Sequence, residues 1–260
     1  MTGPTHVPET WILLRGLTRE QRHWGDFPGL LAAELPGARI VPLDLAGNGR
    51  LCALPSPATV PDMAEQCRAE LARQGIAPPY HVLAMSLGAM VTTAWALAHP
   101  HEIQGCVLIN TSMRPFSPFY RRLRPRNYPL MLKLALLGGM ARQWEEAIMA
   151  ITTHHPPQRE QRLRDWIAYR DECPVSRANA LRQLWAAARY TAPMEGPSVR
   201  TLILSSTQDG LVAPQCSRQL AACWNTDFAD HPSAGHDLPL DDGLWVASQV
   251  KKWHDAGSSH

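Results

Sequence analysis

Ser86 is the residue whose surroundings in this sequence point most directly to chemistry. Residues 84–88 read Ala-Met-Ser-Leu-Gly, so small residues stand two positions before and two positions after the serine. An apolar, strand-like run precedes it, and a helical pattern over 87–98 follows at once. A strand that turns this sharply into a helix needs small flanking side chains and leaves the serine strained and exposed. The pattern predicts a nucleophile elbow, with the N–H of Leu87 at a helix N-terminus, where negative charge is favoured.

A serine hydroxyl is a poor nucleophile until a base takes its proton, so Ser86 needs a histidine supported by an acid. Asp209 follows a predicted strand over 201–206, and His236 lies 27 residues later in another polar loop. The chain order serine, acid, histidine is the one that accompanies this type of elbow. Both loops follow predicted strands. They therefore lie at the carboxyl ends of the strands, the edge at which open α/β sheets place their sites. We therefore predict a Ser86–Asp209–His236 triad.

An oxyanion formed by attack on a carbonyl needs two backbone donors. Leu87 supplies one N–H, and we expect Leu17 to supply the other, because the small Gly16 lets the chain turn into the site. The loops at Gly16 and Asp209 also fit ordinary strand-ending turns. Asp237 is a rival acid, but a residue next to His236 seldom points its side chain at the ring.

Five other histidines compete with His236 for the role of base, and we expect them to be solvated: His99, His101, His154, His155 and His231. The adjacent pair at 154–155 lacks further Cys, Asp or Glu ligands at a suitable spacing, so no metal site is predicted.

The elements that must position these residues alternate along the chain. Apolar strand patterns alternate with helical patterns on both sides of residues 112–197. Strands that are apolar nearly throughout favour a parallel sheet covered on both faces. The strands are predicted over 11–14, 38–44, 80–85, 105–110, 199–206 and 227–229, and the helices over 21–35, 59–74, 87–98, 214–223 and 243–253. The prediction is an α/β fold with a mostly parallel central sheet.

The alternation stops between 112 and 197, where helical patterns appear over 130–137, 143–151, 159–169 and 176–190. We predict an α/β core made of residues 1–111 and 198–260, with a helical cap, or lid, inserted at 112–197.

The cap is also where positive charge gathers. Residues 112–197 hold 14 Lys and Arg against 7 Asp and Glu, a net charge of +7, whereas the whole chain carries +2. The densest part contains Arg121, Arg122 and Arg124. Two explanations stay open: a solvated helical surface, or a positive rim that steers an anionic substrate or an acidic carrier protein toward Ser86.

Composition excludes several other functions. The chain has 260 residues, 45% hydrophobic and 18% charged, which is typical of a globular protein, and the net charge of +2 argues against nucleic acid as the partner. Six cysteines without a Cys-x-x-Cys pair indicate reduced thiols. The N-terminus does not resemble a secretory signal, and no apolar run is long enough for a membrane span. We expect a cytoplasmic protein that does not bind membranes.

With these motifs in place, the chain resembles the α/β-hydrolase superfamily over residues 11–253. Within it, the chain is similar to the capped small-ester group that includes the pimeloyl-acyl-carrier-protein methyl ester carboxylesterases. The motifs that carry the resemblance are Arg15-Gly16-Leu17, Asp-Leu-Ala-Gly-Asn-Gly at 44–49, the elbow at 84–88, Asp209-Gly210 and Gly235-His236. The family usually has histidine where this chain has Arg15 and glycine where it has Ala84. The guanidinium of Arg15 is therefore a candidate for contact with substrate.

The resemblance implies a serine esterase that cleaves a carboxylic ester through an acyl-enzyme, without cofactor or metal. The substrate would be a small-molecule ester, and an acyl carrier protein is a candidate partner. Carbon–carbon bond hydrolases, peptidases and acyltransferases share the same triad and stay open. So does a non-enzymatic member that binds a ligand or partner and keeps only a vestigial site. The sequence predicts neither the acyl chain and alcohol nor the oligomeric state.

Overall fold

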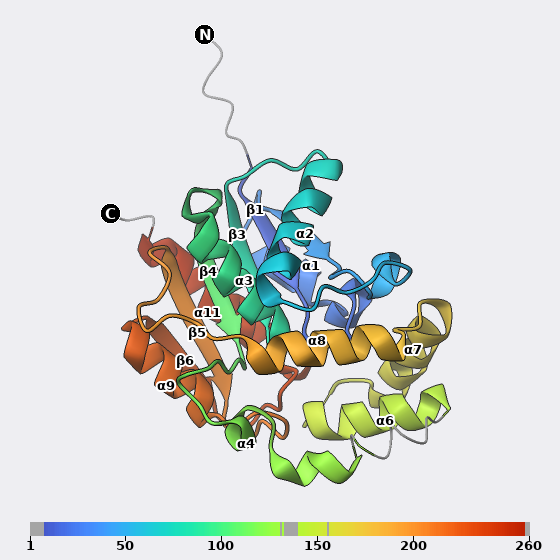
Figure 1. Cartoon of the computed structure of the whole chain (residues 1–260). Helices are drawn as coiled ribbons and strands as arrows, with labels where there is room; N and C mark the ends of the chain where they lie inside the picture. The colour runs from blue at the N-terminus through green and yellow to red at the C-terminus, as the bar shows by residue number, and fades with distance from the viewer. Residues whose placement is uncertain (1–7, 131, 133–139, 155, 258–260) are drawn as a thin grey trace.

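The computed structural model describes residues 8–130, 132, 140–154 and 156–257. Its centre is a six-stranded sheet in the order β2-β1-β3-β4-β5-β6, in which every neighbouring pair is parallel. The strands are β1 (Thr10–Leu14), β2 (Arg39–Leu43), β3 (Tyr80–Met85), β4 (Ile103–Ile109), β5 (Arg200–Ser206) and β6 (Asp227–His231). The four strands β1, β3, β4 and β5 form the middle of the sheet and are buried almost throughout. This confirms the predicted α/β fold (Figure 1).

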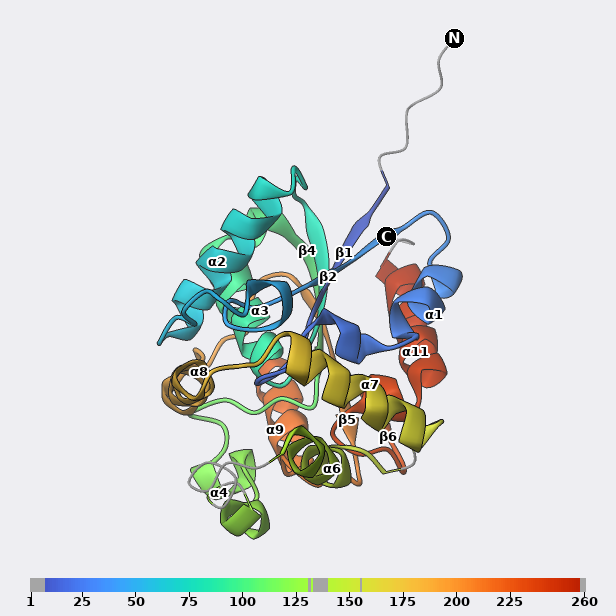
Figure 2. The same cartoon turned by 90° about the vertical axis from the view of Figure 1, so that its right-hand side faces the viewer.

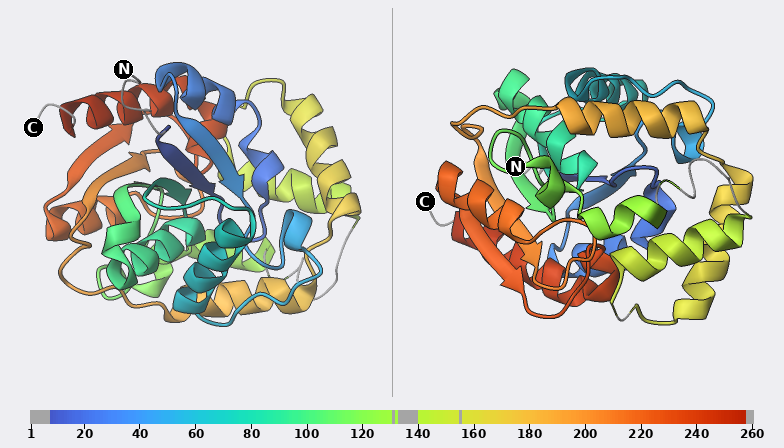
Figure 3. Two further views of the ribbon diagram at one scale, coloured as in Figure 1. Left: turned by 90° about the horizontal axis from the view of Figure 1, so that it is seen from above. Right: turned by 60° about the horizontal axis from the view of Figure 1, so that its bottom comes forward.

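Helices cover both faces of the sheet, as Figures 2 and 3 show. One face packs against α2 (Val60–Arg73), α3 (Leu87–Ala98) and α9 (Gln215–Trp224), whose apolar side chains join a single buried cluster with the strands. The other face packs against α1 (Phe27–Glu34) and α11 (Gly243–Gly257) in a second cluster. Two covered faces explain why the central strands are apolar at successive positions and do not alternate with polar ones.

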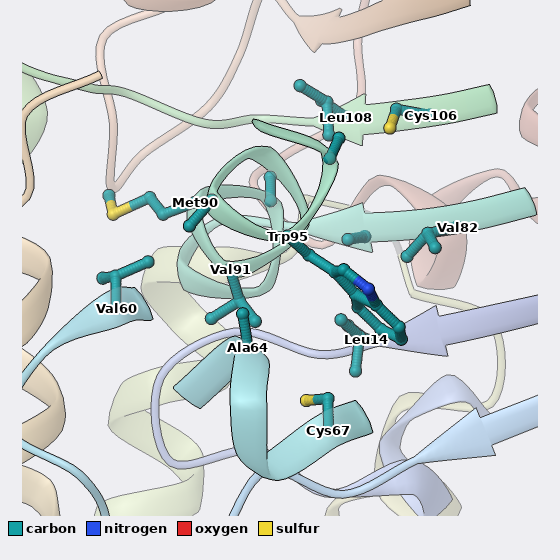
Figure 4. Close-up of a cluster of buried hydrophobic side chains, with 14 of the residues drawn as sticks. Leu14, Val60, Ala64, Cys67, Val82, Met90, Val91, Trp95, Cys106 and Leu108 are labelled. Atoms are coloured by element: carbon teal, nitrogen blue, oxygen red, sulfur yellow. The ribbon is translucent and has the colours of Figure 1, made fainter. Parts of the chain in front are cut away.

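The helix that follows Ser86 is itself almost fully buried. Met90, Val91 and Trp95 of α3 lie between the sheet and α2 (Figure 4). Trp95 has no exposed surface, and its indole N–H donates to Glu102 at 2.8 Å. Truncation of such a side chain typically costs about 3–5 kcal/mol. The core therefore holds α3, and with it the residue at its N-terminus, in a fixed place.

A helical insertion consistent with the predicted cap connects β4 to β5. It contains α4 (Phe119–Arg122), η4 (Pro125–Asn127), α6 (Ala141–Thr152), α7 (Arg159–Glu172) and α8 (Arg177–Arg189). Met149, Leu163 and Trp166 form a small core of their own with Leu240, which lies in α10 (Leu238–Asp241). Most of the predicted helix over 130–137 lies outside the described residues.

One predicted helix, over 21–35, is wrong as a single element. The structure divides it into a short 3-10 helix, η1 (Gln21–Trp24), and α1. Gly25 lies between them with a φ of 56°, in the left-handed region that glycine adopts without strain. Trp24 of η1 and Phe27 of α1 are both buried in the same core. The apolar spacing that predicted one helix therefore comes from two separate elements.

None of the helices in the described ranges combines the length and the apolarity that a bilayer-spanning segment requires.

Candidate functional site

Ser86 occupies the sharp turn between β3 and α3. Its φ of 53° and ψ of −117° fall in a region that side chains other than glycine rarely adopt, which is the strain expected of an elbow. Its N–H donates to the carbonyl of Ile109 at 3.0 Å. A Cβ on Gly88 would lie 2.6 Å from the carbonyl oxygen of Arg15, so only glycine lets α3 start this close to the end of β1. The serine itself stays partly exposed.

His236 and Asp209 are joined by a buried hydrogen bond. Nδ1 of His236 lies 2.7 Å from Oδ2 of Asp209, and their side chains are 6% and 1% exposed. The other carboxylate oxygen, Oδ1, accepts the N–H groups of Leu211 at 2.7 Å and Val212 at 2.9 Å. The acid is therefore fixed from both sides, which sets the orientation of the imidazole and leaves Nε2 as the ring nitrogen available for a proton from substrate or serine.

Asn110, which the sequence analysis missed, connects the loops that carry these residues. It follows β4 directly and has a φ of 46°. Its side-chain amide donates to the carbonyl of His236 at 2.8 Å and to Oγ of Ser206 at 2.9 Å, and its Oδ1 accepts the N–H of Ser206 at 2.8 Å. The end of β4 thus lies between Ser86 and His236. Among the described residues, no hydrogen bond joins those two side chains directly.

The loop after β1 lies against the serine. A Cβ on Gly16 would come 3.0 Å from the Cβ of Ser86 and 3.5 Å from its Oγ. Within the described chain, the N–H groups of Leu17 and Leu87 donate to no protein acceptor. Leu17 follows Gly16 and Leu87 follows Ser86, so these two unpaired N–H groups are the candidates for the pair of donors that an oxyanion requires.

Gln183 of α8 is a second residue that the sequence analysis missed. It has no exposed surface, and its Oε1 accepts the N–H of Thr18 at 2.9 Å. Its amide nitrogen donates to Oδ1 of Asn48 at 2.8 Å and to Oγ of Ser56 at 3.0 Å. One insertion side chain therefore fixes the loop next to Leu17. A glutamine within an amphipathic helix gives no signal of this role in the sequence.

Arg15 does not extend toward solvent. Its guanidinium forms two hydrogen bonds with the carboxylate of Asp237, at 2.9 and 2.5 Å, and lies 4.9 Å from the ring centroid of Trp24. The side chains of Arg15 and Asp237 are 4% and 3% exposed. Asp237, the rival acid, is thus paired with Arg15, whereas Asp209 is paired with the histidine.

Two of the three cap arginines are bound to backbone carbonyls. Arg122 donates to Ala187 and Ala188, at 2.5 and 3.2 Å. Arg124 donates to the carbonyl of Asp209 at 2.6 Å and so supports the acid loop. The backbone of Arg121 accepts the N–H of Ala213 at 2.9 Å, which places it beside the same loop.

The rival histidines are spread over other parts of the fold. His231 was expected to be solvated, which is wrong: it is 7% exposed, and its Nε2 lies 3.1 Å from the carboxylate of Asp242. Its Nδ1 accepts the N–H of Ala234 at 2.8 Å, so both ring nitrogens are engaged. His101 and His154 are exposed, and His155 lies outside the described residues.

Comparison with known proteins identifies the family of the chain. A sequence model of the alpha/beta hydrolase fold matches residues 12–242. No sequence match was found among curated proteins.

Three solved structures with a similar fold illustrate the likeness, at 17–18% sequence identity with the chain. An enol-lactonase from Burkholderia xenovorans has a TM-score of 0.77 at 18% identity, with 97% of this chain and 94% of that chain covered. An esterase from Thermogutta terrifontis has a TM-score of 0.71 at 18% identity, with 96% and 90% covered. A 2-hydroxy-6-oxo-6-phenylhexa-2,4-dienoate hydrolase from a Rhodococcus species has a TM-score of 0.75 at 17% identity, with 95% and 91% covered. At these identities the structures show only a shared fold. The sequence match and the fold together establish that the chain belongs to the α/β-hydrolase family.

Proposed function

We propose that the protein is a serine hydrolase that cleaves carboxylic esters through an acyl-enzyme, with Ser86 as nucleophile, His236 as base and Asp209 as the supporting acid. The observation that carries the proposal is the 2.7 Å contact between Nδ1 of His236 and Oδ2 of Asp209. This pair lies at the same edge of the sheet as the strained turn of Ser86. A charged partner at Nδ1 holds the tautomer in which Nε2 can accept a proton.

The proposed reaction has two halves. Nε2 of His236 takes the proton of Ser86 while Oγ attacks the ester carbonyl carbon, and the N–H groups of Leu17 and Leu87 bind the oxyanion. The tetrahedral intermediate collapses, the ester C–O bond breaks, and the imidazolium protonates the leaving alcohol. Water then attacks the acyl-serine with His236 as base, which releases the carboxylic acid and returns the proton to Oγ.

The structurally similar proteins favour an ester as the substrate. The esterase and the enol-lactonase are named for the cleavage of open and cyclic esters. The third neighbour is named for a different substrate, so carbon–carbon bond hydrolysis is the outcome to test against.

We further propose that the ester is anionic or carrier-bound, as in the carboxylesterase group that the sequence resembles. The net charge of +7 over residues 112–197 supports this, because such a field attracts acidic substrates. Arg122 and Arg124 have structural contacts, so Arg121 is the best candidate for direct contact with the anion. Arg15 is paired with Asp237 and contributes no free charge.

The proposal is tested with p-nitrophenyl esters of graded chain length beside methyl esters of free and carrier-bound acids. We expect hydrolysis of at least one series and a loss of about 10⁴-fold in turnover for Ser86→Ala. The 2-hydroxy-6-oxo-dienoate type of substrate is assayed in parallel. Turnover of that substrate with no hydrolysis of any ester would reject the ester assignment and keep the triad.

A further inference from the structure

Three potential metal ligands converge at the end of the sheet opposite Ser86. Glu9 directly precedes β1, His81 is the second residue of β3, and His254 lies near the end of α11. One carboxylate oxygen of Glu9 and one ring nitrogen of each histidine all lie within 4.8 Å of one another. Ser86 follows His81 by five positions along the strand, a span of about 16 Å, so this cluster is distinct from the proposed catalytic site.

His81 is the unusual member of the cluster. It is 9% exposed, and its side chain hydrogen bonds to no other residue that the structure describes. The ring stacks on Trp11, with centroids 4.5 Å apart and an angle of 11° between the planes. An imidazole nitrogen that has no hydrogen-bond partner among the described residues is available to bind a cation.

Glu9 and His254 are already close to the arrangement of a coordinated pair. Nε2 of His254 lies 2.8 Å from Oε2 of Glu9. On the other side of the ring, Nδ1 lies 3.7 Å from Oδ1 of Asp255. A carboxylate behind the second nitrogen of a ligating histidine is the usual outer contact of metal sites, because it fixes the ring and raises its basicity.

The space for an ion is present next to these atoms. A cavity of about 330 Å³ is lined by all three residues, together with Gln104, Arg200, Trp253 and Gly257. This volume exceeds that of a metal ion with its bound water, so solvent can complete the coordination.

We propose that Glu9, His81 and His254 bind a divalent transition-metal ion, for which Zn²⁺ is the best match. Two imidazoles and one carboxylate, with a fourth position for water, form a set that suits zinc chemistry. Bonds of about 2.0–2.2 Å require ligand atoms roughly 3.4 Å apart. The ligand atoms lie within 4.8 Å of one another, so binding requires them to move closer by at most about 1.4 Å.

Arg200 is the group that opposes a cation here, since it lines the same cavity. Its guanidinium lies 4.6 Å from the ring centroid of Trp253, and Nη2 lies 3.6 Å from the carboxylate of Asp227. Part of its positive charge is therefore compensated by Asp227, and the carboxylate of Glu9 provides a negative charge at the proposed ion, whereas that of Asp255 is shared with Lys251 at 3.0 Å.

The ion would tie the chain before β1 to β3 and to the last turns of α11. A ligand that binds only the folded chain raises its stability in proportion to the logarithm of its concentration. Because the ion lies far from Ser86, we expect it to raise the melting temperature and to leave ester hydrolysis unchanged.

The test is a titration of the full-length, chelator-treated protein with Zn²⁺ against a chromogenic zinc indicator, with melting curves recorded in parallel. We expect one tight site per chain. Glu9→Gln, His254→Gln and His81→Phe should each weaken it at least ~10–100-fold, the range seen when even outer contacts of a metal site are lost. His81→Phe keeps an aromatic ring against Trp11, so its loss of binding is separable from a loss of packing.

The matched control is the pair Glu65 and His99, whose Nε2–Oε1 distance is 2.7 Å, similar to that of Glu9 and His254. Within the described ranges no third ligand joins this pair, so Glu65→Gln and His99→Gln should leave the tight site intact. Absence of a tight site, or equal weakening by the control substitutions, would overturn the proposal and leave the cluster as an ion pair that fastens α11.

Discussion

Arg15 and Asp237 form a buried ion pair that joins the loop beside Ser86 to the loop of His236. The two residues are 222 positions apart, and both oxygens of the carboxylate accept N–H groups of the guanidinium. Gly16 follows Arg15 and contacts the serine, while His236 precedes Asp237. The backbone N–H of Asp237 also donates to Thr152 at the end of α6, at 2.7 Å. The pair thus sets the spacing between the two proposed reacting loops and the insertion.

Asp237→Asn tests this relationship. Removal of one partner leaves a buried, uncompensated guanidinium, so we expect the free energy of unfolding to fall by about 3–5 kcal/mol. A double variant, Arg15→Met with Asp237→Leu, should recover much of that loss because no charge is left unpaired. Urea denaturation of the two variants provides the comparison. Equal stability of Asp237→Asn and the wild type would mean that the pair contributes nothing.

Asp209→Asn should lower catalytic turnover, whereas Asp237→Asn should lower stability. The amide can still occupy the site, but it no longer stabilises the imidazolium or holds the correct tautomer of His236, so we expect turnover to fall by about 10⁴-fold. Steady-state kinetics on the best ester, with melting curves as a check of folding, measure this. A larger loss of turnover in Asp237→Asn than in Asp209→Asn would reassign the acid.

The charge of the cap predicts a dependence on salt. Screening shortens the reach of the field to about 8–10 Å near physiological ionic strength, so kcat/KM for an anionic ester should fall as salt rises. Arg121→Ala should lower the same constant at low salt. Arg73→Ala is the control, because this exposed arginine lies on α2, outside the insertion, and pairs with Glu70 of the same helix. A neutral ester that responds as strongly as the anionic one would show that the cap charge does not act on the substrate.

His81 predicts a dependence of stability on pH. Its folded pKa, about 4, is lower than the unfolded value of 6.5, so between these values the unfolded chain binds a proton that the folded chain does not. Stability therefore falls as the pH drops from 6.5 to 4. Glu9, His254 and Arg200 are the charged groups that act on the ring, and the first of these works against the shift. In metal-free protein, His81→Phe should show a shallower fall over this range. If stability depends on pH equally in His81→Phe and the wild type, a group other than His81 takes up the proton.

The parts of the site that depend on local sequence could be predicted. Ser86 was identified because an elbow demands small neighbours, and the Asp209–His236 contact was expected because both residues follow parallel strands that end at one edge. The parallel sheet was equally accessible from the apolar strand patterns.

The contacts that hold these residues in place could not be predicted, because they join distant parts of the chain. Gln183 and Thr18 are 165 positions apart, and Arg15 was a candidate for substrate contact because no local pattern identifies Asp237 as its partner. The break at Gly25 was missed because a local pattern misleads: Trp24 and Phe27 have the spacing of apolar residues in a single helix.

The identity of the nucleophile is the central claim, and covalent labelling tests it most directly. A fluorophosphonate forms a stable adduct with an activated serine, and mass spectrometry of the digested protein locates it. The proposed mechanism predicts a single adduct on the peptide that contains Ser86, and neither adduct nor ester hydrolysis in Ser86→Ala. An adduct on another residue, or full hydrolysis by Ser86→Ala, would contradict it.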